Sequence, residues 1–182
     1  MNSIPLHEQL MRLWWRQGCS LSKPQRRNLA LLCQALAMSP NCRLGTLALY
    51  MPIESDRDSL VERLRRLLKS RTIGQLQWYP PLLRLIFAQW DGCEVPLVMD
   101  RTDIENRWSI LSVGVAYRCR ILPLAWCLLP FGGTSAQVQQ ALLKQIKPCL
   151  PTDERVQVYL FADSEFRSVA VQQLCRHWHW HW

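Results

Sequence analysis

Two aspartates follow short segments with the character of buried strands, and carboxylates at strand ends are candidate ligands for metal ions. Asp100 follows the apolar run 95–99, and Asp163 follows the segment 155–162. We expect each aspartate to end a strand, at the carboxyl edge of a sheet where open α/β sheets bind ligands. Two carboxylates at one edge repel each other unless a hard cation such as Mg²⁺ lies between them. Taken singly, each aspartate is better explained as a strand-end or helix-cap residue.

The order of the predicted elements decides whether the two aspartates meet. We expect strands at 95–99, 109–117, 120–129 and 155–162, and helices at about 135–147 and 166–176. The two-residue link after the second strand is typical of an antiparallel hairpin. In this βββ-α-β-α order the first and fourth strands can lie side by side. The last residues, 178–182, alternate tryptophan and histidine, and we expect them to form a stub of a fifth strand with its tryptophans inward.

Four blocks in this half resemble successive blocks of the transposases of bacterial insertion sequences. They are Leu97-Val-Met-Asp-Arg-Thr102, Ile110-Leu-Ser-Val-Gly-Val-Ala-Tyr-Arg118, Ile121-Leu-Pro-Leu-Ala-Trp126 and Leu160-Phe-Ala-Asp-Ser-Glu-Phe166. Those enzymes belong to the DDE class, whose catalytic domain is ribonuclease-H-like. The resemblance implies an α/β fold with a mixed sheet of strand order 3-2-1-4. It is dense from about 97 to 166 and looser over the first ninety residues.

The resemblance also implies a chemistry and the residues that carry it. Asp100 matches the first metal-binding catalytic aspartate of the family and Asp163 matches the second. The implied activity is metal-dependent DNA strand cleavage and transfer, which is the chemistry of transposition. Two divalent ions about 3.5–4 Å apart can stabilise both the attacking and the leaving oxygen of a phosphodiester. The implied cofactor is Mg²⁺ or Mn²⁺, because both ions favour oxygen ligands.

The third carboxylate of the family has no counterpart in this sequence. In the family it is a glutamate on a helix after the fifth strand, and the nearest approach to its motif here would place Leu124 at that position. Glu165 and Asp103 are the other acids nearby, and we assign neither to catalysis. We therefore expect a C-terminally truncated copy, an incomplete two-metal site, and DNA cleavage that is weak or absent.

The first ninety residues are expected to be helical, and they account for the entire net positive charge of the chain. The formal net charge is +8, with 13 basic and 5 acidic residues in 1–90, and nine of each in 91–182. A predicted helix over 57–69 has an apolar stripe on one side and basic residues on the other: Arg63, Arg65, Arg66 and Lys69. Such a face is often only a solvated surface, but its acids are too few to pair its bases. We therefore expect these residues to contact DNA phosphates.

Clusters of aromatic residues leave two interpretations open. The pairs Trp14-Trp15 and Trp78-Tyr79 are compatible with stacking on nucleic-acid bases, although such residues more often fill a core or cover a domain seam. We expect Trp126, in the third strand, to be core. His177, His179 and His181 would share one face of a strand, and such a row is also compatible with metal binding.

We expect two domains: a basic helical DNA-binding domain over 1–90 and a truncated ribonuclease-H-like domain over 91–182. No run of eighteen apolar residues and no export signal is present, and the eight cysteines lack a C-x-x-C pair. These features favour free thiols and a place in the bacterial cytoplasm, at the nucleoid. The expected partners are double-stranded DNA at transposon ends and a second copy of the chain or intact transposase.

Two alternatives remain open at this stage. The chain can be a non-catalytic DNA-binding remnant that interferes with intact transposase, or a ribonuclease-H-like nuclease that takes its third acid from a partner chain. Salt-sensitive DNA affinity without metal-dependent cleavage would favour the first alternative, and activity only in an oligomer would favour the second.

Overall fold

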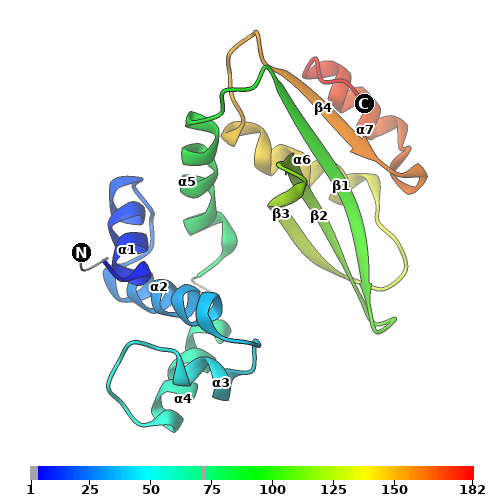
Figure 1. Cartoon of the computed structure of the whole chain (residues 1–182). Coiled ribbons are helices and arrows are strands. Elements are labelled where there is room, and N and C mark those ends of the chain that lie inside the picture. Colours follow the sequence, from blue (N-terminus) through cyan, green and yellow to red (C-terminus); the bar gives the residue numbers. More distant parts are fainter. Residues whose placement is uncertain (1–3, 71–72) are drawn as a thin grey trace. The chain divides into compact units, whose positions relative to one another are not determined.

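The computed structural model describes residues 4–70 and 73–182, apart from the side chains of 75–77. The chain divides into two compact units, Met1–Leu82 and Leu83–Trp182. The first is helical and the second contains the sheet, as Figure 1 shows. Each unit is described separately below.

Four helices and the first part of a fifth build the helical unit. They are α1 (Leu6–Arg16), α2 (Lys23–Met38), α3 (Leu44–Leu49), α4 (Arg57–Lys69) and α5 (Gln75–Ala88). α2 begins at a full capping box, in which Ser22 and Gln25 each bond the backbone of the other. Asp56 caps α4 by accepting a hydrogen bond from the backbone N–H of Ser59.

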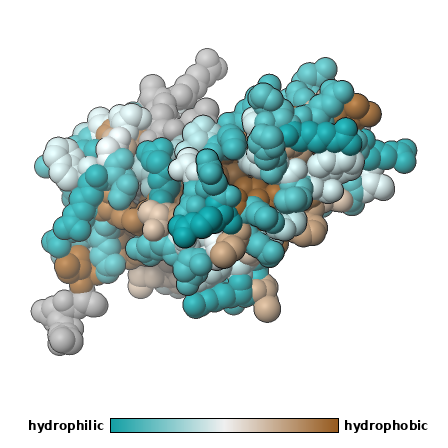
Figure 2. All heavy atoms as spheres, turned by 90° about the horizontal axis from the view of Figure 1, so that it is seen from above, coloured by the Kyte–Doolittle hydropathy of each residue, from teal (hydrophilic) through white to brown (hydrophobic). Residues whose placement is uncertain are grey.

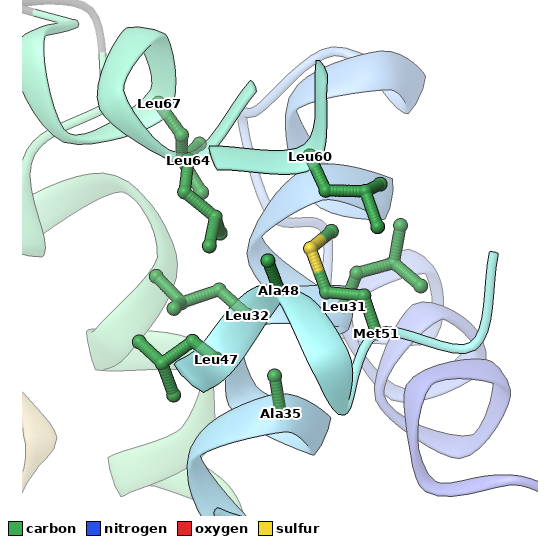
Figure 3. Packing of buried hydrophobic residues seen from close by; sticks show 9 residues of the cluster. All are labelled: Leu31, Leu32, Ala35, Leu47, Ala48, Met51, Leu60, Leu64 and Leu67. Carbon is green, nitrogen blue, oxygen red and sulfur yellow. The ribbon is translucent and has the colours of Figure 1, made fainter. Parts of the chain in front are cut away.

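The core of this unit forms where one apolar side of α4 meets α2 and α3. Leu60, Leu64 and Leu67 of α4 pack against six buried side chains of the neighbouring segments, drawn in Figure 3: Leu31, Leu32, Ala35, Leu47, Ala48 and Met51. Leu68 completes the stripe in the sequence but remains 61% exposed. A second cluster surrounds Trp14, which is completely buried. The side of α4 away from this core is left for its charges.

α5 carries a pair of prolines, Pro80-Pro81, which local rules favour at the start of a helix. The helix begins at Gln75 and contains both prolines. Trp78, in the turn before them, packs edge-on against Trp14 with ring centroids 6.1 Å apart. Tertiary packing of this kind offsets the cost of proline beyond the first turn.

The second unit is built on a four-stranded mixed sheet. Its elements are β1 (Glu94–Ile104), β2 (Trp108–Tyr117), β3 (Arg120–Pro130), α6 (Ala136–Ile146), η1 (Lys147–Cys149), β4 (Gln157–Ala162), η2 (Ser164–Phe166) and α7 (Val169–His177). The strand order is β3-β2-β1-β4, with β1 antiparallel to β2 and parallel to β4. This arrangement confirms the predicted 3-2-1-4 mixed sheet.

One face of the sheet is buried and the other is half-exposed. Alternate residues of the central strands, such as Val95, Leu97 and Val113, are fully buried on the face where α6 packs against β2 and β3. The opposite side carries partly exposed apolar residues, including Leu128 and Phe161. Trp126 is 36% exposed on that side, so the expectation that it is core was wrong. Hydrophilic residues cover most of the face seen in Figure 2, with apolar patches between them.

The last residues follow the expected path only in part. His181 pairs in parallel with Tyr159 of β4, which supplies the predicted stub of a fifth strand. Trp180 is buried, as expected, and its ring lies 5.4 Å from the ammonium of Lys147. Trp182 is 55% exposed, so the expectation that the tryptophans all face inward was wrong for it. His177 instead ends α7 and His179 has a positive φ, so the three histidines do not form one row on a strand.

All eight cysteines are free thiols. Three are buried, and burial raises the pKa of Cys175 to about 11. Cys42, Cys93 and Cys119 are exposed. Among the residues that the structure describes, no helix combines the length and the apolar character needed to span a membrane.

Two leucines of α4 provide a matched test of the helical core. Leu64 is 1% exposed and Leu68 is 61% exposed. We predict that Leu64→Ala lowers the free energy of unfolding by about 2–4 kcal/mol, because it removes buried methyl groups and leaves a cavity. Leu68→Ala should change it by less than about 0.5 kcal/mol. Urea unfolding followed by circular dichroism measures both, and equal effects of the two changes would contradict the packing described here.

Candidate functional site

Asp100 and Asp163 follow neighbouring positions of two adjacent parallel strands. The paired register of β1 and β4 runs from Glu94↔Gln157 to Met99↔Ala162, and each aspartate is the next residue. Neighbouring strands lie about 4.8 Å apart, so the backbones carrying the two carboxylates are side by side. The predicted juxtaposition of these two segments is present in the sheet.

Both aspartates are exposed to solvent. Val95, Leu97 and Met99 alternate inward along β1, so Asp100 projects from the opposite face, and it is exposed. Asp163 has extended backbone angles after Ala162, and it too is exposed. Asp163 lies just past the last paired residue of β4 and borders a small hollow together with Leu160, Ala162 and Phe166. The backbones of the two aspartates are therefore adjacent at one end of the β1–β4 pair.

Asp100 does not end its strand, which corrects the sequence-based expectation. β1 continues to Ile104, because the residues after Met99 keep their antiparallel pairing with β2, with Asp100 opposite Ser112. Only the parallel pairing with β4 stops at Met99. Asp163 does end β4, and its carboxylate accepts a hydrogen bond of 2.9 Å from the backbone N–H of Glu165. One oxygen of Asp163 is thus engaged in capping the turn that follows.

The two nearby acids that the sequence left unassigned are held by Arg101. Its guanidinium lies 2.8 Å from Glu165 and 3.4 Å from Asp103. Asp103 also accepts a hydrogen bond of 2.6 Å from the hydroxyl of Ser109. Asp103 therefore lies within β1, with its carboxylate held by both Arg101 and Ser109. These contacts give both acids a partner without a metal.

Asp100 and Asp163, called the acidic edge below, supply oxygen ligands but do not form a complete two-metal site. Asp100 and Asp163 offer the hard carboxylate oxygens that Mg²⁺ and Mn²⁺ bind. In the residues described here, no group of three or more histidine, cysteine, aspartate or glutamate side chains gathers as a metal site would require. The donor set thus fits one weakly held cation, whose remaining ligands would be water.

The basic residues of α4 differ in how free they are. Arg63 donates a hydrogen bond of 2.9 Å to the side chain of Asn28, and Arg65 forms an exposed ion pair of 3.6 Å with Glu62. Arg66 and Lys69 are exposed, and within the described ranges neither forms an ion pair. Arg66 and Lys69 are therefore the cations of this face that are most available to a ligand.

A hollow of about 460 Å³ separates the basic side of α4 from the start of α2. It is lined by polar and basic side chains above an apolar floor: Gln25, Asn28, Ser55, Ser59, Leu60, Arg63, Arg66, Leu67, Ser70 and Ile73. Next to it, Arg63 also borders a smaller hollow together with Lys23 and Arg27 of α2. The basic surface thus extends from α4 onto α2.

Sequence reasoning missed the contribution of α2 to this surface. Lys23 and Arg27 are one helical turn apart at the start of α2, so their spacing already placed them on one side. What the sequence did not contain was the contact of that side with α4, made through Asn28 and Arg63. Such a contact between residues thirty-five positions apart arises only from the fold.

No protein-family model matches this chain, and no curated protein matches it significantly. Among solved structures, the crystal structure of the Mos1 strand transfer complex contains a chain with 16% sequence identity to this one. The match covers 82% of this chain and 55% of that chain, with a TM-score of 0.31. The likeness is distant. This chain spans about half the length of the one it resembles.

The Asp56 cap should stabilise the start of α4, the helix that carries the basic residues. Hydrogen bonds from Ser59 hold the pKa of Asp56 below its ordinary value. We predict that Asp56→Ala lowers the melting temperature, because it removes the acceptor for an N–H at the start of the helix, while Asp56→Asn retains most of the stability.

The same cap has a pH dependence with a defined sign. Since the folded-state pKa of Asp56 is depressed, its contribution is present above the unfolded-state pKa of about 3.9 and is lost as the pH falls through the folded value. Melting curves of the wild type and Asp56→Asn should therefore converge in acid. A difference that grew on acidification would contradict the capping role.

Proposed function

We propose that this chain is a DNA-binding protein of the DDE transposase kind, acting in the bacterial cytoplasm at the nucleoid. The observation that carries the proposal is the basic surface of the helical unit. Arg63, Arg66 and Lys69 of α4 adjoin Lys23 and Arg27 of α2 along connected hollows. Double-stranded DNA, with a charge every 1.7 Å or so along its axis, is the polyanion that suits such a surface.

The contacts of the basic residues suggest different roles in binding DNA. Arg66 and Lys69, which are exposed, would bind phosphates and release counterions. Arg63 is oriented by its hydrogen bond to Asn28, which reduces the side-chain entropy lost on binding. Arg65 has to exchange Glu62 for a phosphate, so its net contribution would be smaller.

The acidic edge suggests the chemistry that such a protein would carry on bound DNA. Asp100 and Asp163 would hold Mg²⁺ or Mn²⁺, which in this class of enzyme activates the attacking oxygen and stabilises the leaving one. Without a third carboxylate among the described residues, we propose that metal binding is weak and that DNA strand cleavage and transfer are impaired.

A second candidate function is a non-catalytic DNA-binding remnant that interferes with intact transposase. The observation that favours it is a contrast between the two sites. The basic surface is extensive, whereas two of the four acids near the ends of β1 and β4, Asp103 and Glu165, are already paired with Arg101. This function requires DNA affinity from the helical unit and nothing from Asp100 or Asp163. The two candidates therefore differ only in metal-dependent cleavage.

Replacement of two arginines of α4 tests the DNA-binding surface. We predict that Arg63→Ala/Arg66→Ala weakens binding to duplex DNA at least about 10-fold at moderate salt, and lowers the slope of log affinity against log salt by about 2. The matched control is Arg107→Ala/Arg120→Ala, which removes the same charge from exposed positions of the sheet unit. Fluorescence anisotropy across a salt series gives both quantities. Equal losses in the two double variants would show a general charge effect and contradict the proposal.

Metal binding and DNA nicking test the acidic edge. We predict weak Mn²⁺ binding by calorimetry, reduced further by Asp100→Asn and by Asp163→Asn but unchanged within about twofold by Asp103→Asn, because Asp103 is already paired with Arg101. Nicking of supercoiled plasmid with Mg²⁺ should be slight or undetectable. Robust nicking that Asp100→Ala abolishes would overturn the view that the site is impaired, and would exclude the remnant.

A further inference from the structure

Two adjacent tryptophans of α1 have opposite fates in the fold. Trp14 is completely buried in the second core cluster, whereas Trp15 is 71% exposed. A helix directs successive residues about 100° apart, so burying one ring of the pair forces the other outward. A tryptophan that remains largely in water does not gain the free energy of burying its ring. Trp15 is the most exposed aromatic residue of the described helical unit.

The surroundings of Trp15 are almost entirely cationic. The guanidinium carbon of Arg26 lies 5.1 Å from the centre of its ring, within cation–π range. Trp15 borders a hollow of about 440 Å³ together with Met11, Arg12, Arg16, Lys23 and Arg26. No acidic residue lines this hollow in the described part of the chain. The nearest acid in sequence, Glu8, is 3.9 Å from Arg12 in an exposed pair.

Arg26 indicates that the hollow is built to receive a ligand. Its side chain is only 8% exposed, yet its Nε has no hydrogen-bond partner in the structure. One other nitrogen of the guanidinium donates to the backbone carbonyl of Cys19 at 3.4 Å. Burying a donor without an acceptor is costly, and an anionic oxygen entering the hollow would offset that cost. A flat ring beside such an anion site fits a nucleotide, which combines a base with a phosphate.

The hollow beside Trp15 is continuous with the basic surface already described. Lys23 lines both this hollow and the next one, which Arg27, Asn28 and Arg63 also border. Asn28 and Arg63 in turn line the large hollow beside α4. Basic residues therefore border neighbouring hollows from α4, past the start of α2, to the exposed ring of Trp15.

We infer that Trp15 is a stacking site for an unpaired nucleobase, with Arg26 and its neighbours holding the adjoining phosphate. This inference rests on the proposed DNA binding and adds that the chain recognises a single-stranded segment next to a duplex. Base stacking needs one open aromatic face and tolerates any sequence. A membrane-binding helix would need a broad apolar face, but the apolar residues Leu10, Met11 and Leu13 of α1 are partly covered.

The test compares two DNA probes and three variants of the full chain. The probes are a blunt duplex and the same duplex with a short single-stranded tail that carries 2-aminopurine, whose fluorescence is quenched by stacking. Trp15→Ala should weaken binding to the tailed duplex about 10-fold and abolish the quenching, with less than about a twofold change on the blunt duplex. Trp15→Phe, which keeps a stacking ring, should retain most of both signals. Leu49→Ala removes another exposed apolar side chain of the helical unit and should change neither.

The outcomes separate this inference from the proposed function. Arg63→Ala/Arg66→Ala should weaken binding to both probes; if it does not, but Trp15→Ala still acts on the tail alone, the α4 surface fails and the stacking site stands. No effect of Trp15→Ala, or an equal loss on both probes with unchanged circular dichroism, would overturn the stacking site. Binding to phosphatidylserine vesicles that depends on Trp15, without an effect of the tail, would overturn it in favour of a membrane surface.

Discussion

The parallel pairing of β1 with β4 is the constraint on which the acidic edge depends. The register is fixed by apolar residues that face each other on the buried side, Val95 with Val158 and Leu97 with Leu160. A shift of one residue would turn these side chains to the exposed face and expose the core, so the register is strongly specified. The same register sets Asp100 beside Asp163. The adjacency of the two aspartates in the chain's sheet therefore follows from core packing and needs no interaction between the acids themselves.

In the helical unit, one side of α4 packs in the core and the other side carries the basic residues. α4 buries Leu60, Leu64 and Leu67 and leaves its cations on the other side. Repulsion among those cations is tolerable because they are solvated, and because the apolar contacts of the opposite side supply the stability. The same division recurs in α1, where Trp14 joins the core and Trp15 does not. In both helices the surface that can contact a ligand is the consequence of how the buried side is packed.

Much of the sheet could be predicted because its signals are local or topological. Apolar runs, short links and the βββ-α-β order predict the mixed sheet that the structure contains. The predictions that were wrong concern positions where tertiary contacts override a local sequence signal. Two prolines favour the start of a helix by local rules, yet Trp78 packs on Trp14 and the helix that contains Pro80 begins earlier. Asp100 ends an apolar run but does not end its strand. The backbone of β1 stays paired with β2 as far as Ile104, and this pairing does not depend on the side chains being apolar. Trp126 is apolar but alternates onto the uncovered face.

Anomalous X-ray diffraction from crystals soaked in Mn²⁺ is the most direct test of whether the two aspartates act together. The account predicts a single weak site held by the carboxylates of Asp100 and Asp163, with water as the other ligands. It also predicts no peak at Asp103 or Glu165, which are already paired with Arg101. Carboxylates of Asp100 and Asp163 turned away from each other, or Mn²⁺ bound at Asp103 and Glu165 instead, would contradict it.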